Sequence, residues 1–277
     1  MLELATCLLL AVLYVASLYI WNSEHNRDHP TTIKKRFVSV SVIMLIAPIF
    51  LYLHFREDIT MGKVTLWQLL GIRSEKLGLA FLLPLLLTVL LFLGPISIQI
   101  KNGVWRIYVA PAYWFNSFRD LIWIRNHIVA PLSEEFTYRA CMMPVLLLKF
   151  STTTTILITP LFFGVAHLHH MAERIRSGID KRTAIIISTF QFVYTTIFGI
   201  YSAYLFVRTG HFMAPFIAHA FCNHMGFPDV NDLVSQPEPQ RKIFCGLYIL
   251  GLIGFLTLAP VLSNPKIYAH NLYDAYV

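Results

Sequence analysis

The chain has 277 residues, of which 56% are apolar and 13% are charged, whereas soluble domains have roughly 45–50% and about 25%. Its mean hydropathy is +0.61. Too few charges remain to cover the surface of a soluble domain of this size, but a helical membrane protein needs charges only in its loops. The 22 lysines and arginines lie in short clusters between apolar runs and give a formal net charge of +7. This pattern is typical of loops that face anionic lipid headgroups, so the lipid bilayer is an expected partner and nucleic acid is not.

The N-terminal half contains three apolar runs that are expected to span the membrane. The first covers residues 2–21, and no basic segment precedes it, which favours a retained helix over a signal peptide. A polar loop at 22–36 separates it from a second span at 37–55. The third span covers 77–100 and carries two prolines, Pro84 and Pro95, at which kinks are expected.

Two mixed segments of this half are expected at the membrane surface. Residues 56–76 have aromatic and aliphatic side chains at helical spacing but are too short and too charged to span. Residues 103–126 are rich in Trp, Tyr, Arg and Asn, and their aromatic side chains are interpreted as an interfacial belt.

The C-terminal half is predicted to contain a helix at about 131–149 that begins at Pro131. Four threonines, Thr152 to Thr155, are expected to link it to an apolar run at 156–170. The remaining apolar segments are expected at 183–207, 211–227 and 243–260. The fold class is therefore all-α, a polytopic membrane protein of about eight transmembrane helices, with residues 1–277 forming one domain. Four of the loops hold four Lys or Arg each, so the positive-inside rule does not decide the orientation.

The polar stretch Pro-Leu-Ser-Glu-Glu-Phe-Thr-Tyr-Arg at 131–139 interrupts these apolar runs. An ionisable group at membrane depth costs about 2.5 to 3.5 kcal/mol, so Glu134, Glu135 and Arg139 are functional candidates. On a helix, Glu135 and Arg139 are four residues apart on one face and form a favourable pair. Glu134 is rotated about 100° away from that pair and is free to face something else. A purely structural Glu135–Arg139 pair remains possible.

Imidazole and amide side chains recur at helical spacing in two later segments. His167 follows Phe163 by four residues, and His219 and Asn223 are also four apart. A carboxylate and a neutral imidazole can hold a water and remove its proton. An amide and a second imidazole can donate hydrogen bonds to the oxyanion that forms when water attacks a carbonyl. Together with Glu134, these groups suffice for peptide hydrolysis without a covalent nucleophile.

Three short motifs carry a family resemblance. Glu-Glu-x-x-x-Arg at 134–139, Phe-x-x-x-His at 163–167 and His-x-x-x-Asn at 219–223 resemble those of the CAAX protease and bacteriocin-processing family of intramembrane proteases. The flanking text is similar to that of eukaryotic type II CAAX prenyl endopeptidases over about 119–228, the expected catalytic core, and again around residues 264–268. No motif position departs from the family pattern.

The resemblance implies a multi-pass protease of the endoplasmic reticulum membrane. Such enzymes remove the last three residues of CAAX proteins, Ras-like small GTPases among them, whose cysteine carries a farnesyl or geranylgeranyl group. Carried over by position, Glu134 and His167 would activate water, and His219 and Asn223 would form the oxyanion site. Glu135 and Arg139 would support the site, and the resemblance implies no cofactor and no metal.

Three other interpretations of the same residues stay open. His167, His170 and Glu173 are acceptable zinc ligands, so a metalloprotease is an alternative, although the chain has no HExxH motif. Buried Glu and His also occur in proton relays of transporters, but no internal repeat supports that alternative. A thiol protease would use Cys141 or Cys222. All four cysteines are instead interpreted as buried apolar residues without disulfides: Cys7, Cys141, Cys222 and Cys245.

Overall fold

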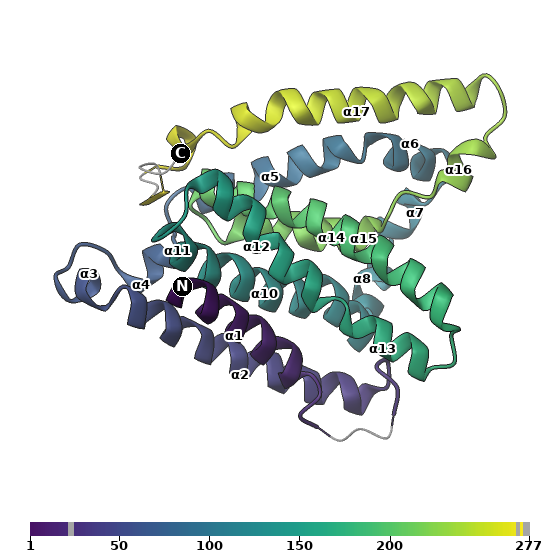
Figure 1. The fold of residues 1–277 in the computed structure, drawn as a ribbon. Coiled ribbons are helices and arrows are strands. Elements are labelled where there is room, and N and C mark those ends of the chain that lie inside the picture. The colour runs from purple at the N-terminus through teal and green to yellow at the C-terminus, as the bar shows by residue number, and fades with distance from the viewer. Residues whose placement is uncertain (22–24, 270–271, 274–277) are drawn as a thin grey trace.

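Every regular element in the part of the chain that the structure describes is a helix. The computed structural model describes residues 1–21, 25–269 and 272–273, and these contain no strand, which confirms the all-α prediction. Figure 1 shows α1 and α2 along one edge of the bundle, α17 along the opposite edge, and α10 and α11 between them.

The first two helices form an antiparallel pair. Helix α1 (Leu2–Ser17) is shorter than the predicted run, and α2 (Pro30–His54) begins earlier than predicted. Pro30 fits the first helical position because its missing N–H would have no partner there, and His29 caps the helix through Nδ1, which accepts from the Thr31 amide at 3.3 Å. The basic residues at 34–36 therefore lie on α2 and not in the preceding loop, whose residues 22–24 lie outside the described part.

The third apolar run is a broken helix. Helix α5 (Leu77–Leu91) and helix α6 (Leu93–Lys101) meet at an angle of 74°. Pro95 cannot donate to the carbonyl of Leu91, and its ring excludes that carbonyl, which explains the break at this point. The kink predicted from Pro95 is confirmed, whereas Pro84 lies inside α5. The predicted surface segments contain the short helices α3 (Arg56–Thr60), α4 (Leu66–Leu69), α7 (Trp105–Tyr108) and α8 (Pro111–Ser117). Residues 121–126 of the second segment instead belong to the central helix.

The central helix begins ten residues before the predicted start at Pro131. It runs without a gap through α9 (Leu121–Ile124), η1 (Arg125–Val129), α10 (Ala130–Glu135), η2 (Phe136–Cys141) and α11 (Met142–Leu147), in which η1 and η2 are π-helical. Asp120 caps this run by accepting from the Ile122 amide at 2.8 Å. Pro131 and Pro144 each come within three residues after a π-helical segment, where the wider turn accommodates a ring that an α-helical turn would exclude.

Four further helices and three short ones complete the bundle. They are α12 (Thr152–Ala166), α13 (His169–Arg176), α14 (Lys181–Thr209), α15 (Met213–Met225), α16 (Val230–Val234), α17 (Gln240–Leu262) and the 3-10 helix η3 (Pro265–Tyr268). The four threonines are not a linker, because Ser151 caps α12 by accepting from the Thr154 amide at 3.3 Å. In the described part of the chain, four helical stretches are long and apolar enough to cross a membrane, or five if α5 and α6 form one span, so the count of eight stays a prediction.

Helices α12 and α14 pack along each other closely enough to require glycine at their contact. A Cβ atom on Gly199 would lie 2.8 Å from the Cβ of Pro160 and 3.0 Å from Nη2 of Arg139. We expect Gly199→Ala to destabilise the folded protein by about 1–3 kcal/mol through overpacking, measured by thermal unfolding in detergent. Gly246→Ala is the matched control, because nothing lies within 4 Å of a Cβ there. Equal melting temperatures for the two variants would contradict this prediction.

Candidate active site

The central helix carries both glutamates into the middle of the bundle. Its segments contact α1, α2, α12, α14 and α15, so helices from both halves of the chain surround it (Figure 1). Glu135 is fully buried, while the side chain of Glu134 is 18% exposed. The two neighbours therefore have different environments, as their positions on a helix predict.

Glu135 is held by three partners. Its Oε2 atom lies 3.2 Å from Nε of Arg139 and accepts a hydrogen bond from the Ser202 hydroxyl. Its Oε1 atom accepts from Nδ1 of His219 at 2.6 Å. The predicted pair with Arg139 is present. The sequence did not indicate the contacts to Ser202 and His219, because these residues lie 67 and 84 positions away.

Arg139 is a fully buried cation. Its guanidinium carbon lies 4.5 Å from the centre of the Phe163 ring, and Nη2 donates to the Gly199 carbonyl at 3.4 Å. Its Nε is close to Glu135 but is not aligned for a hydrogen bond, and Nη1 has no partner among the described residues. The charge of Glu135 is therefore the main compensation for Arg139.

His219 lies between the two glutamates. Because Nδ1 donates to Glu135, the other ring nitrogen, Nε2, is directed elsewhere and lies 3.7 Å from Oε2 of Glu134. A carboxylate on Nδ1 orients the imidazole and fixes which ring nitrogen carries the proton. His219 thus links the buried carboxylate to the one that reaches the cavity.

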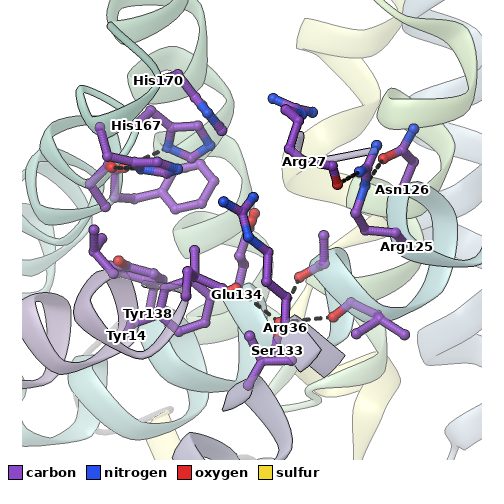
Figure 2. Close-up of a pocket in the computed structure, with 18 of the residues that line it drawn as sticks. Tyr14, Arg27, Arg36, Arg125, Asn126, Ser133, Glu134, Tyr138, His167 and His170 are labelled. Carbon is purple, nitrogen blue, oxygen red and sulfur yellow. Dashed lines mark hydrogen bonds between the residues drawn. The ribbon is translucent and has the colours of Figure 1, made fainter. Parts of the chain in front are cut away.

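Glu134 and His167 line one cavity of about 170 Å³, which has room for several waters. Figure 2 shows Glu134 near the centre, His167 above it and to the left, and Tyr14, Tyr138 and Ser133 lower in the view. The Nδ1 atom of His167 donates to the Phe163 carbonyl at 2.7 Å, which leaves Nε2 as the acceptor in the neutral ring. Among the described residues no direct hydrogen bond joins Glu134 to His167.

Asn223 does not line this cavity. Its side chain is exposed, and Nδ2 donates to the Asn126 carbonyl at 2.9 Å. That carbonyl is available because Pro131, five residues later, has no N–H to donate in a π-helical turn. Asn126 itself lines the cavity. His219, the other member of the predicted oxyanion pair, is not among the lining residues either. Each of the two contacts a residue that does line the cavity, His219 through Glu134 and Asn223 through Asn126.

A group of possible metal ligands lies beside the cavity, but it differs from the one predicted. The donor atoms of His169, His170 and Glu173 lie within 4.8 Å of one another, whereas the sequence suggested His167 in place of His169. Glu173 is already bound by Arg36 and by the Tyr19 hydroxyl, each at 2.8 Å. A cation here would have to displace an arginine, so the residues fit a zinc ion poorly.

Among the described residues, none of the hydrogen bonds joins a cysteine sulfur to a histidine, the partner that a thiol nucleophile needs. Cys7 and Cys141 are buried, and Cys222 and Cys245 are partly exposed. All four sulfurs are unpaired. The interpretation as buried apolar residues therefore holds for the first two.

The fold and this site define a multi-pass helical membrane protein in which buried Glu, His and Arg side chains from distant helices converge beside a small cavity. A family model described as "Type II CAAX prenyl endopeptidase Rce1-like" matches residues 116–225, the stretch that contains all of these side chains.

Relatives extend the match to the rest of the chain. CAAX prenyl protease 2 of Homo sapiens is 42% identical over 271 residues, which cover 95% of this chain and 82% of the relative. The protein of the same name from Arabidopsis thaliana is 30% identical, with 99% of this chain and 93% of the relative covered. The one from Saccharomyces cerevisiae is 28% identical, with 96% and 98% covered. No solved structure matches the chain significantly. The chain belongs to the type II CAAX prenyl endopeptidase family and is a membrane endopeptidase.

Proposed function

We propose that this protein removes the C-terminal aaX tripeptide from prenylated CAAX proteins at the endoplasmic reticulum membrane. The observation that carries the proposal is the shared cavity of Glu134 and His167, with the Glu135–His219–Arg139 cluster directly behind it. Relatives named CAAX prenyl protease 2 support the substrate class. The apolar outer surface of the bundle suits a substrate whose prenyl chain lies in lipid.

In this proposal a water in the cavity attacks the carbonyl of the prenylcysteine. Glu134 and the free Nε2 atom of His167 hold the water, and one of them takes its proton as the carbon–oxygen bond forms. The same proton then goes to the nitrogen of the leaving tripeptide when the carbon–nitrogen bond breaks. Activation of the water thus needs only groups that line this cavity.

The oxyanion of the tetrahedral intermediate needs a nearby donor. His219 can donate to the oxyanion through Nε2 while Nδ1 stays bonded to the Glu135 carboxylate, a state in which both ring nitrogens carry a proton. Asn223 reaches the same region only if it exchanges its bond to the Asn126 carbonyl for one to the substrate. In this proposal His219 is the principal donor, and Asn223 joins it when substrate displaces that bond.

Mass spectrometry of a farnesylated CAAX peptide after incubation with the purified protein tests the reaction and the bond position together. We expect release of an intact tripeptide and a farnesylcysteine with a free carboxyl group. Cleavage at another bond would contradict the proposal. So would the absence of cleavage under conditions in which a known CAAX protease, added as a control in the same lipid, is active.

The same assay addresses the zinc alternative through the cluster of His169, His170 and Glu173. We expect chelator-treated protein to keep its activity, because Glu173 is bound by an arginine and the water-activating groups lie elsewhere. Activity that is lost with the metal and restored by zinc would favour the metalloprotease.

A further inference from the structure

Three arginines line the same cavity as Glu134 and His167, and the proposed hydrolysis does not use them. They are Arg27 from the segment before α2, Arg36 from α2, and Arg125 from η1. Figure 2 shows Arg27 and Arg36 beside the open space that separates His167 and His170 from Arg125 and Asn126. The cavity thus has one water-activating side and one strongly cationic side.

Two of these arginines build the framework of the cationic side. Nη1 of Arg125 donates to the Arg27 carbonyl at 3.1 Å and to Oδ1 of Asp28 at 2.8 Å. The hydrogen bond from Arg125 holds the pKa of Asp28 below its usual value, so Asp28 is a carboxylate at neutral pH. Nη2 of Arg36 donates to Oε1 of Glu173 at 2.8 Å. These contacts position the backbone of Arg27 at the cavity.

Among the described residues, the guanidinium of Arg27 has two acidic neighbours, and neither lies within hydrogen-bonding distance. Its Nε lies 3.6 Å from Asp28 and its Nη1 lies 4.0 Å from Glu173, both longer than a hydrogen bond. Within the described part of the chain, Nε of Arg36 is also buried without a hydrogen-bond partner. Within the described residues, three guanidinium groups on this side of the cavity therefore face two carboxylates, Asp28 and Glu173, which leaves one positive charge in excess.

We propose that Arg27, supported by Arg36 and Arg125, binds the C-terminal α-carboxylate of the CAAX tail. This inference rests on the proposed function. A guanidinium pairs with a carboxylate through two parallel hydrogen bonds, and the aaX segment ends in one carboxylate. Three extended residues span about 10 Å from the scissile bond. Recognition of the carboxylate at that distance explains why cleavage would leave a tripeptide of fixed length.

An anionic lipid headgroup is the competing ligand for this charge. The side chain of Arg27 is 45% exposed, whereas those of Arg36 and Arg125 are only 16% and 14% exposed. All three line the cavity that contains Glu134. The geometry therefore favours a ligand that enters the cavity together with the scissile bond.

Two farnesylated peptides of identical sequence, one with a free C-terminal acid and one with a C-terminal amide, test the inference on the full-length protein. We expect the wild type to prefer the acid by about 10- to 100-fold in kcat/KM. Arg27→Gln should reduce this ratio to near one by slowing only the acid, and Arg27→Lys should restore part of it. Because both peptides are measured on one preparation, the ratio does not depend on the folded fraction.

Arg119→Gln is the matched control. Arg119 is exposed, stacks over Phe115 at 3.7 Å and does not line the cavity, so the wild-type ratio should be kept. Equal cleavage of acid and amide by the wild type would overturn the carboxylate inference and leave the proposed function intact. Loss of activity in Arg27→Gln only in vesicles with anionic lipid, with equal rates for both peptides, would also overturn it, since the ligand would then be a headgroup. Cleavage of neither peptide by the wild type would overturn the proposed function and this inference with it.

Discussion

Glu134→Gln is expected to lower kcat/KM for a prenylated CAAX peptide by about 100- to 10,000-fold, the range of a positioned general base. The amide keeps the shape of the side chain but cannot take a proton from water. Glu134 reaches the cavity, and its one close charged contact among the described residues is Nε2 of His219 at 3.7 Å. The variant should therefore fold like the wild type, and its loss should lie in kcat.

His167→Ala should cause a loss of similar size, and the double variant should be little worse than either single one, because both residues act on the same water. Steady-state cleavage of a farnesylated peptide measures all three variants. Glu57→Gln, on the exposed helix α3, is the control and should keep full activity. Wild-type rates for Glu134→Gln would remove Glu134 from the proposed mechanism and assign the base to another group.

Arg139→Met is expected to be the most destabilising charge change in the bundle, at about 3–5 kcal/mol of unfolding free energy. It removes the cation that lies 3.2 Å from a fully buried carboxylate and leaves Glu135 with only neutral or titratable partners. Thermal unfolding in detergent measures the loss of stability, and cleavage of a farnesylated peptide by the same preparation measures the activity that remains.

A second substitution separates charge from packing. Glu135→Gln in the Arg139→Met background removes the uncompensated carboxylate, so it should recover part of the lost stability without recovering activity. Arg119→Met is the surface control and should change the melting temperature little. If the double variant is as unstable as Arg139→Met alone, the packing of Arg139 against Phe163 is what stabilises the site.

Local sequence signals predicted most of the helices but not the start of the central one. The run at 183–207 is confirmed within two residues at each end by α14, because Asp180 caps it and Gly210 ends it with a positive φ. Pro131 was interpreted as a helix start, which is its commonest position. That interpretation was wrong because a π-helical segment lets the helix pass through the proline, and propensity rules describe α-helical turns only.

The motifs proposed residues for the site but did not indicate how these residues contact one another. Glu134 and His167 line one cavity, and helical spacing predicted the Glu135–Arg139 pair, while the catalytic roles stay predictions. Spacing does not indicate which distant helix faces which, so the contact of Glu135 with His219 and the bond of Asn223 to Asn126 were not foreseen. The sequence showed the three cavity arginines only as members of basic clusters expected in loops, and nothing in it placed them beside Glu134.

By itself the sequence determined an all-helical membrane protein, because in lipid the backbone N–H and C=O groups of such long apolar runs form their hydrogen bonds within a helix. It also determined which ionisable residues are costly enough to require a role. Only the tertiary structure decided which of the two adjacent glutamates is buried in an ion pair and which one reaches the cavity. Helix packing buries Glu135 against Arg139, Ser202 and His219 and leaves Glu134 at the cavity. This difference depends on contacts between residues far apart in the chain. Helical spacing predicts only which residues of one helix share a face, and not which other helix that face meets.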